Sequence, residues 1–307
     1  MNMMSKKILF FGSGSVAAAS LEKLLKHTEI TLVITKRRAP KFKGIPPVEL
    51  IAKEKRLNLA FADNKTELEE LVLGMTENYD LGIVLDYGVI ITEKTIESFP
   101  FGIINSHFSL LPEWRGADPI TFSLLSGQDR TGVSLMQIDS GLDTGELFET
   151  TTISINTNDT NTSLTEKLID LSDSLLKKNI PLIIDGSATK YSQDKDKIVT
   201  FSKKIKKEDG FLDVSKPASV LAREIRAFKG WPRSYMKLGD LNVIVEEATN
   251  TDEFLPIGKI KIDDAKCIVI GTGKGSLKIK KLMPFGKNVM NSKDFLNGYK
   301  NRLNTES

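Results

Sequence analysis

The stretch KILFFGSGSVAAASLEKLL, residues 7–25, joins a short apolar run to a helical pattern through two glycines. Residues 7–11 have the length and apolar composition of a buried strand. Gly12 and Gly14 follow at once, and apolar side chains then recur at helical spacing as far as Leu25. A strand, a glycine turn and a helix in this order form the repeating unit of a parallel sheet, so the sequence predicts an α/β fold.

Runs of these two kinds alternate over the first part of the chain. Apolar runs bounded by turn residues alternate with runs of helical periodicity, which favours a parallel sheet covered by helices on both faces. Further strands are expected at residues 29–35, 81–90, 101–107, 131–139 and 145–155, and helices at 48–55, 67–75 and 119–127. Ser163 and Glu166 have the spacing of a capping box, so a long amphipathic helix is expected to begin there and to end near Leu182.

The last third of the chain has a different pattern. A helix at 218–228 is followed by short alternating runs separated by glycine and aspartate turns. These runs are residues 234–238, 241–248, 258–262, 267–273 and 276–283, and a small helix at 292–299 closes the chain. Strands so short and so regularly spaced predict a small β-barrel of the OB-like kind. With the polar, lysine-rich segment before them, they indicate a first domain at 1–190, a linker at 191–208 and a C-terminal domain at 209–307.

Composition and charge exclude several classes of protein. The chain of 307 residues is 40% hydrophobic, which is enough to fill ordinary cores, and no apolar run is long enough to cross a membrane. The N-terminal residues lack the pattern of a secretory signal, and the single cysteine, Cys267, cannot form an internal disulfide, so a cytoplasmic protein is expected. The net charge of +3 is only mildly basic, yet lysine and arginine cluster at 35–44 and 202–207. Such clusters suit either solvated loops or an anionic partner.

The glycine turn has part of a dinucleotide-binding fingerprint. Gly12, Gly14 and Ala17 stand where that fingerprint has its small residues, directly after a strand and at the start of a helix. The acidic residue expected at the end of the second strand is missing, because that place reads ITKRR, residues 34–38. Any tight strand-to-helix turn favours glycine. A nicotinamide-dependent oxidoreductase is therefore an alternative.

The segment INSHFSLLPEWRGADPI, residues 104–120, contains His107, one of only two histidines in the chain. It begins at the C-terminal end of an expected strand, where ligands bind in open parallel sheets. Asn105 and His107 are two residues apart, so in a continuing strand both side chains point to the same side. A carboxamide and an imidazole directed at one point can hold a carbonyl oxygen and move a proton, which is the equipment for acyl transfer.

The segment DSGLDTGE, residues 139–146, offers a carboxylate to the same place. Asp143 stands between two glycines in a turn-rich connection of two expected strands. A carboxylate beside an imidazole fixes its tautomer and stabilises its protonated form. Taken singly, Asn105 could cap a turn, His107 could lie in the core and Asp143 could be an ordinary turn residue. Their meeting at neighbouring strand ends favours a catalytic site.

Other chemistries lack their signatures. One cysteine and two widely separated histidines cannot supply a zinc set, so no metal is expected. The phosphate-loop pattern G-x-x-x-x-G-K-[ST] and the nucleophile elbow G-x-S-x-G are both absent, which leaves NTPase and α/β-hydrolase hypotheses without support.

The two central segments resemble the signature of folate-dependent formyltransferases. INSHFSLLPEWRGADPI followed by TGVSLMQIDSGLDTGELF has the Asn-x-His, the Ser-Leu-Leu-Pro, the Arg-Gly loop and the later Asp of that family. Three further segments, SKKIKKEDGFLDVS, IRAFKGWP and LMPFGKNVMNSKDFLNG, extend the likeness over nearly the whole length. The wording of MQID and GLDTG is most similar to the branch that formylates initiator methionyl-tRNA.

The resemblance implies a fold, a site and two partners. The fold is a Rossmann-like parallel sheet domain followed by a small OB-like β-barrel, in a monomer. The catalytic set is Asn105, His107 and Asp143, and the folate-contacting residues are Ser109, Leu110, Leu111 and Pro112. The formyl donor is 10-formyltetrahydrofolate and the acceptor is initiator methionyl-tRNA, with no metal and no membrane partner. The implied tRNA contacts are Arg37, Arg38, Lys41, Lys43, Lys203, Lys204, Lys206 and Lys207.

Two departures from the family pattern and two alternatives accompany this reading. The basic loop at 35–47 is shorter than usual and reads Pro-Pro-Val-Glu where Ser-Pro-Val-Lys is common, and Asp86 stands where a small residue is usual. Formyl transfer to an amino sugar nucleotide is an alternative within the family. A non-enzymatic RNA-binding module is another, although such a binder has no chemical need for the trio of asparagine, histidine and aspartate.

Overall fold

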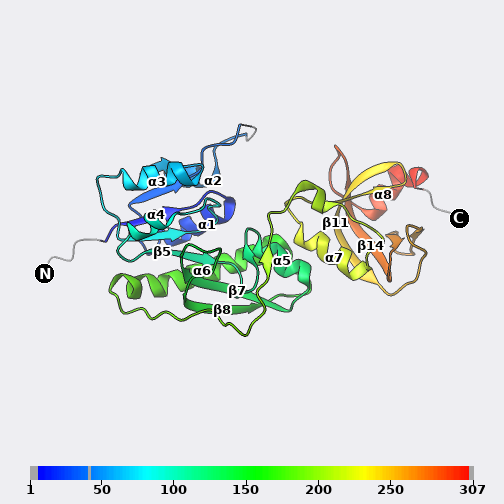
Figure 1. Ribbon diagram of the computed structural model, residues 1–307. Coiled ribbons are helices and arrows are strands. Elements are labelled where there is room, and N and C mark those ends of the chain that lie inside the picture. The colour runs from blue at the N-terminus through cyan, green and yellow to red at the C-terminus, as the bar shows by residue number, and fades with distance from the viewer. Residues whose placement is uncertain (1–5, 41–42, 304–307) are drawn as a thin grey trace. The chain divides into compact units, whose positions relative to one another are not determined.

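The computed structural model describes residues 6–40 and 43–303, which form two compact units. The first unit contains the described residues up to Pro119 together with Arg130–Ser154 and Thr165–Lys203. The second contains Ile120–Asp129, Ile155–Leu164 and the described residues from Lys204 onward (Figure 1). Within the described ranges, no helix is both long and apolar enough to cross a lipid bilayer. The predicted boundaries at residues 190 and 208 stay a prediction.

A seven-stranded sheet forms the centre of the first unit, in the order β3-β2-β1-β4-β5-β7-β8. Its strands are β1 (Ile8–Phe11), β2 (Leu32–Thr35), β3 (Leu59–Phe61), β4 (Leu81–Val84), β5 (Ile103–His107), β7 (Arg130–Gln137) and β8 (Leu147–Ser154). The first five strands are parallel, which confirms the Rossmann-like prediction. β7 and β8 are antiparallel to their neighbours. This direction was not predicted, because an apolar run shows burial but not the direction of its strand.

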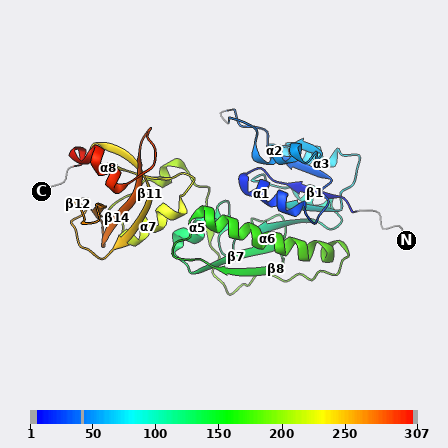
Figure 2. The ribbon, with the colours of Figure 1, turned by 180° about the vertical axis from the view of Figure 1, so that it is seen from behind.

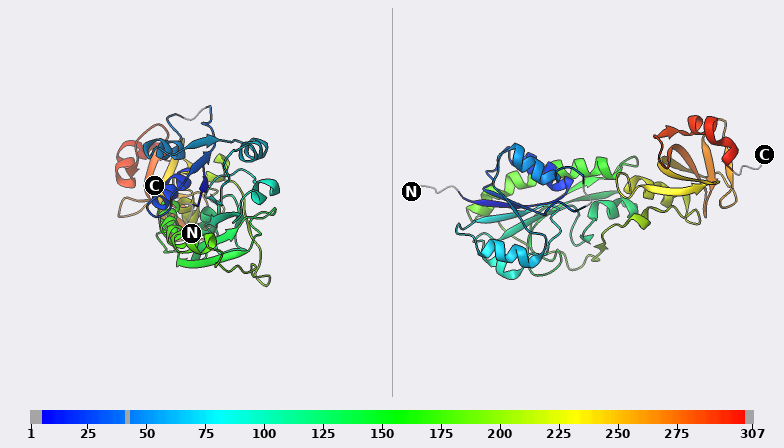
Figure 3. Two further views of the ribbon diagram at one scale, coloured as in Figure 1. Left: turned by 90° about the vertical axis from the view of Figure 1, so that its left-hand side faces the viewer. Right: turned by 90° about the horizontal axis from the view of Figure 1, so that it is seen from above.

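Helices cover both faces of this sheet. One face carries α1 (Ser15–Leu24), α2 (Pro47–Glu54) and most of α6 (Asn161–Ile184), and the other carries α3 (Lys65–Leu73) and the short α4 (Glu93–Glu97) (Figure 3). An ion pair joins α1 to α6, with Lys23 Nζ 2.8 Å from Asp170 Oδ1. Because both faces are covered, the central strands are apolar on both sides, and β1, β2 and β4 are buried throughout.

The order of the strands creates a topological switch point beside β1. The chain runs from β1 to β2 and β3 on one side and then returns to place β4 and β5 on the other. The connections that leave β1 and β4 therefore diverge, and the space between them is where α/β sheets bind ligands. The Gly12–Gly14 turn follows β1, and Asp86 follows β4. β5, which carries Asn105 and His107, is the next strand.

The second unit contains a six-stranded antiparallel sheet in the order β10-β11-β14-β13-β12, with β15 paired to β14 (Figure 2). Its elements are α5 (Pro119–Ser126, from Ile120), α7 (Ala218–Ala227), β10 (Ser234–Leu238), β11 (Leu241–Thr251), β12 (Ile260–Ile262), β13 (Ile268–Gly271), β14 (Ser276–Pro284), β15 (Met290–Asn291) and α8 (Ser292–Tyr299), with single 3₁₀ turns at Lys207–Gly210 and Lys300–Arg302. β11 and β14 shift register near Glu247, and such bulges bend a sheet. α7 and α8 close an apolar core that includes Val243, Leu277 and Phe295. This arrangement is consistent with the small barrel that was predicted.

One local prediction needs correction, and two short strands were not predicted. The capping box of α6 is formed by Thr160 and Ser163, whose backbone N–H groups each donate to the other's hydroxyl at 3.0 and 3.3 Å, so the helix begins at Asn161 rather than at Ser163. β3 was not predicted, because it has only three residues and all are half-buried. The segment expected to be a linker contains β9 (Phe201–Ser202), which pairs with β6 (Arg115–Gly116) inside the first unit.

Candidate active site

The end of β5 presents Asn105 and His107 on one side of the strand. His107 is 6% exposed, and Asn105 is half-buried. Their backbones pair with Ser134 and Met136 of β7, which fixes the two side chains in register. In the part of the chain that the structure describes, the Asn105 carboxamide has no hydrogen-bond partner, so its N–H donors are available to a ligand.

Both ring nitrogens of His107 face an oxygen atom. Nε2 lies 3.1 Å from the backbone carbonyl of Trp114, and Nδ1 lies 3.8 Å from Oδ2 of Asp143. A carbonyl oxygen can only accept, so Nε2 must carry a hydrogen and donate it. The lone pair of the neutral ring is then at Nδ1, on the side of the carboxylate. Nδ1 therefore faces the carboxylate oxygen of Asp143.

The backbone around Asp143 holds this carboxylate toward His107. Asp143 Oδ2 accepts a hydrogen bond of 2.8 Å from the backbone N–H of Gly116, and the residue has a φ of 51°. Asp139, on the same loop, accepts from the backbone N–H of Gly141 at 3.0 Å and from the hydroxyl of Thr144 at 2.7 Å. The two aspartates therefore have different roles. Asp139 stabilises the fold of the loop, and Asp143 points toward His107.

Gly116 has to be glycine for this arrangement. Its φ is 117°, and a Cβ there would lie 2.3 Å from the backbone oxygen of Ser202, which belongs to the neighbouring strand β9. No side chain fits at that distance, and a backbone atom cannot move aside without breaking the β6–β9 pair. The close approach places the N–H of Gly116 where it can bind Asp143.

Gln193 is a site residue that sequence analysis missed. Its Nε2 donates to the backbone oxygens of Asp143 and Gly145 at 2.8 and 3.0 Å, and its Oε1 accepts from Arg115 at 2.6 Å. Thr200 adds a second link, because its hydroxyl accepts from the backbone N–H of Trp114 at 2.8 Å. Both residues come from the segment expected to be a linker. Nothing in its polar, lysine-rich sequence distinguishes these two side chains from solvated ones.

Strained backbone conformations gather at this end of the sheet. Among the described residues, the non-glycine positions with positive φ are Arg56, Asp86, Trp114, Asp143, Arg233 and Lys266. Half of them lie in the loops after β4, β5 and β7: Asp86 at 46°, Trp114 at 55° and Asp143 at 51°. Each costs about 1 kcal/mol, and such residues cluster at functional sites because the surrounding contacts hold them in place.

Asp86 occupies the space beside the glycine turn. A Cβ on Gly14 would lie 1.9 Å from Asp86 Oδ2, and the backbone N–H groups of Ser13 and Gly14 lie 3.1 and 3.4 Å from the Asp86 carbonyl. The Asp86 side chain is exposed to water on one side. Its pKa is nevertheless raised to about 6, first by loss of hydration against the surrounding protein and then by the charge of Asp118. Its carboxylate takes the place beside the start of α1 where a pyrophosphate binds in dinucleotide enzymes. This disfavours the nicotinamide alternative.

The Ser-Leu-Leu-Pro segment is buried. Ser109, Leu110 and Leu111 are at most 8% exposed. The Ser109 carbonyl accepts from the hydroxyl of Ser134 at 2.8 Å, and that hydroxyl in turn accepts from the backbone N–H of Leu111 at 3.1 Å. These bonds shape the loop that carries the Trp114 carbonyl to His107. A contact of Ser109, Leu110, Leu111 and Pro112 with folate stays a prediction.

The predicted basic contacts fall into distinct groups. Arg37 is held by two carboxylates, with its Nη1 2.9 Å from Asp63 Oδ2 and 2.5 Å from Glu67 Oε2. Arg38 and Lys43 are exposed, and Lys41 lies outside the described residues. Lys203, Lys204, Lys206 and Lys207 are all exposed. Within residues 6–40 and 43–303, no group of three or more histidine, cysteine, aspartate or glutamate side chains is placed to hold a metal ion.

A Rossmann-like sheet with polar side chains gathered at its strand ends defines an α/β enzyme fold. Residues 6–180 match the formyl transferase family, and residues 204–300 match the formyl transferase C-terminal domain. The chain therefore belongs to the formyl transferase family.

Solved structures agree with this fold over most of the chain. An N-formyltransferase from Helicobacter canadensis, in complex with folinic acid and dTDP-3-aminofucose, has a TM-score of 0.68 at 23% identity, covering 90% of this chain and 98% of that one. WlaRD, a sugar 3N-formyltransferase with dTDP and 5-N-formyl-THF, has a TM-score of 0.69 at 23% identity, covering 93% and 100%. HypX from Aquifex aeolicus, in complex with tetrahydrofolic acid, has a TM-score of 0.65 at 14% identity, covering 99% of this chain and 49% of its own.

Proposed function

We propose that the protein is a methionyl-tRNA formyltransferase, which moves a formyl group from 10-formyltetrahydrofolate to the α-amine of methionyl initiator tRNA. The choice of tRNA as acceptor rests on the difference in net charge between the N-terminal and C-terminal parts of the chain. Residues 1–203 have 23 lysines and arginines against 27 acidic residues, whereas residues 204–307 have 20 against 13, so the net charges are −4 and +7. A strongly basic C-terminal domain beside a transferase domain suits an acceptor that is itself a large polyanion.

The donor set at the end of β5 fits formyl transfer. 10-Formyltetrahydrofolate supplies the formyl group as the second substrate. Asn105, whose carboxamide has no partner among the described residues, would donate to the formyl oxygen as that oxygen gains negative charge. A preorganised donor of this kind contributes about 3 kcal/mol at the transition state. His107 would stabilise the same oxygen when it is protonated, or pass a proton.

The His107–Asp143 pair would take the proton that the attacking amine loses. The amine nitrogen forms a bond to the formyl carbon, the bond from that carbon to the folate nitrogen breaks, and that nitrogen keeps the bonding electrons and gains a proton. Nδ1 of His107 lies 3.8 Å from Asp143 Oδ2, so a proton taken up at Nδ1 would lie beside a negative charge before it passes to the leaving nitrogen.

The acceptor tRNA would be bound through its phosphates. Exposed lysines at 203, 204, 206 and 207 lie at the point of the chain where the first unit ends and the second begins, and Arg38 and Lys43 lie in the loop after β2. Contacts of this type give affinity that falls with salt and carry little base readout. Arg37 would act differently, because its pairs with Asp63 and Glu67 hold the start of the loop.

One assay tests the proposal. Purified protein, 10-formyltetrahydrofolate and initiator tRNA charged with radiolabelled methionine are combined, and formylmethionine is measured after deacylation. We expect rapid formation of product by the wild-type protein, and a fall in turnover of about 10²-fold or more in His107→Asn and in Asp143→Asn.

Two matched variants serve as controls. His27→Asn removes the other histidine, which forms a partly buried pair with Asp173 at 2.9 Å, and Asp139→Asn removes the charge of the loop aspartate but keeps an oxygen that can accept from Gly141 and Thr144. Both should keep most of the turnover. No product from a folded, folate-binding protein would refute the tRNA acceptor, and equal losses in the variants and their controls would refute the catalytic set.

An amino sugar nucleotide is the second candidate acceptor. Two of the similar structures are described as a sugar 3N-formyltransferase and as a complex with a dTDP-linked aminosugar. A competition assay decides between the two candidates. If the amino sugar nucleotide is the acceptor, it should inhibit formylation of methionyl-tRNA at concentrations near its own KM, and otherwise it should not.

A further inference from the structure

The second unit carries a row of aromatic side chains on its surface. The ring of Phe211 lies 5.8 Å from that of Tyr235, and Tyr235 lies 6.5 Å from Phe285, both in edge-to-face geometry. The outer rings are 52% and 55% exposed. Large aromatic side chains so open to water signal a binding surface when they are contiguous. Lys237 is exposed two residues after Tyr235 on the same strand, so both side chains are on the same face of β10.

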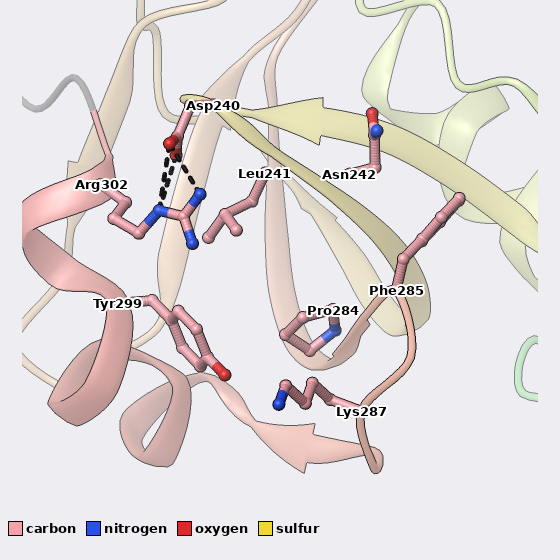
Figure 4. Close-up of a pocket in the computed structure, with 8 residues that line it drawn as sticks. All are labelled: Asp240, Leu241, Asn242, Pro284, Phe285, Lys287, Tyr299 and Arg302. Carbon is pink, nitrogen blue, oxygen red and sulfur yellow. Dashed lines mark hydrogen bonds and ion pairs between the residues drawn. The ribbon is translucent and has the colours of Figure 1, made fainter.

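A small basic pocket adjoins this row at Phe285 (Figure 4). It has a volume of about 210 Å³, and its polar lining consists of Asp240, Asn242, Lys287, Tyr299 and Arg302. In Figure 4 the ammonium group of Lys287 and the hydroxyl group of Tyr299 point toward each other across the pocket. The volume is below the range of about 300–1,000 Å³ that holds whole small molecules, so the pocket suits part of a larger ligand.

The charges of the pocket favour an anionic group. Arg302 binds Asp240 through Nε and Nη2, at 3.0 and 2.7 Å, and neutralises that carboxylate while Nη1 stays outside the pair. Lys287 has no ion-pair partner in the described part of the chain. The pocket therefore keeps one net positive charge beside an open aromatic ring. A phosphate with a flat base next to it matches both features, since bases stack on aromatic side chains and phosphates bind lysine and arginine.

We propose that Phe285 and the adjoining pocket of Lys287, Tyr299 and Arg302 bind one unpaired nucleotide of the acceptor RNA, with its base against the aromatic row and its phosphate in the pocket. This inference rests on the proposed function, which supplies an RNA partner. The second unit is basic overall, so an RNA matches its field better than a protein partner does. The linker lysines would neutralise the backbone, whereas this surface would add a contact to a base.

Binding of charged initiator tRNA to the full-length protein tests the inference, measured by fluorescence anisotropy over a series of salt concentrations. Phe285→Ala should raise Kd by about 5- to 100-fold, the range for loss of one stacked base, and should leave the salt dependence unchanged. Phe285→Trp should keep the affinity near that of the wild type. Lys287→Ala should lower the slope of log K against log salt by about 0.7, because one phosphate contact to an unpaired nucleotide is lost.

Two matched controls separate this surface from general effects. Phe254→Ala removes another exposed aromatic side chain, 84% exposed, and Lys293→Ala removes another exposed lysine of the same unit. The inference is overturned if the wild-type protein formylates tRNA but Phe285→Ala and Lys287→Ala bind it as these controls do; the surface would then serve a protein partner or none. If the wild-type protein forms no formylmethionyl-tRNA, the proposed function fails first and the inference falls with it.

Discussion

The loops around Asp143 and the surface around Phe285 use polar side chains in opposite ways. At Asp143 the polar groups are enclosed and bond to backbone atoms of other loops: Gly116 donates to its carboxylate, and Gln193 donates to its carbonyl. At Phe285 the groups are open to water, and Arg302 pairs with Asp240 although both side chains are exposed. The first region holds a catalytic side chain in one position, whereas the second leaves its side chains open to a binding partner. Substitutions in the loops around Asp143 should therefore have large effects on stability and turnover, and substitutions of exposed binding residues should have smaller effects on tRNA binding.

Gly116→Ala should show the largest effect of this kind. The added Cβ meets the backbone of Ser202 at 2.3 Å at a φ of 117°, so either β6 separates from β9 or the loop shifts. We expect the free energy of unfolding to fall by about 2–4 kcal/mol, measured by urea denaturation, with turnover reduced even under conditions where the protein is folded. The reduced turnover follows because the N–H of Gly116 orients Asp143.

Gly186→Ala is the matched control. Gly186 also belongs to the first unit and has a φ of 79°, but no atom lies within 4 Å of its would-be Cβ. Only the conformational strain remains, about 1 kcal/mol, and turnover should be unchanged. Equal losses of stability in the two variants would mean that the contact with Ser202 is not what requires a glycine at position 116.

The difference between the two regions also explains what sequence analysis could find. Asn105 and His107 share a strand, so their spacing alone predicts a common direction, and Asp143 stands out between glycines in a turn. Gln193 and Thr200 could not be found in this way, because their roles arise from pairing with a loop about 80 residues earlier in the chain. Local patterns predicted most helices and strands for the same reason. They did not give the direction of β7, which runs antiparallel to β5, because that direction depends on the pairing of the two strands.

Asp86→Asn tests the electrostatic side of the first region and should have an intermediate effect. Partial loss of hydration, followed by the charge of Asp118, raises the Asp86 pKa from its ordinary value of 3.8 to about 6, so the folded state favours the protonated form. This contribution to stability is complete below about pH 4 and is lost as the pH rises through about 6. Asparagine keeps the shape, tolerates the positive φ and carries no charge at any pH. The variant should therefore match the wild type in acid and exceed it above pH 6.

The size of this gain follows from the shift in the Asp86 pKa. A raised pKa of this extent corresponds at most to about 3 kcal/mol, and accessibility of the carboxylate to water reduces the expected gain to about 1 kcal/mol. Denaturant midpoints measured from pH 4 to pH 8 provide the test, with Asp196→Asn in an exposed turn as the control. A gain that is the same at every pH would indicate packing rather than charge as its cause.

Replacing Lys206 and Lys207 together by alanine should have the smallest effect per residue. Both side chains are exposed, so each phosphate contact is screened by salt and contributes little on its own. We expect KM for methionyl-tRNA to rise by about 3- to 10-fold with kcat unchanged, and the slope of log K against log salt to fall by about 2. The control pair Lys55→Ala and Lys65→Ala removes the same charge from exposed positions of the first unit. If both pairs of substitutions change KM equally, the net charge of the protein alone attracts the tRNA. Lys206 and Lys207 would then not form a local binding surface.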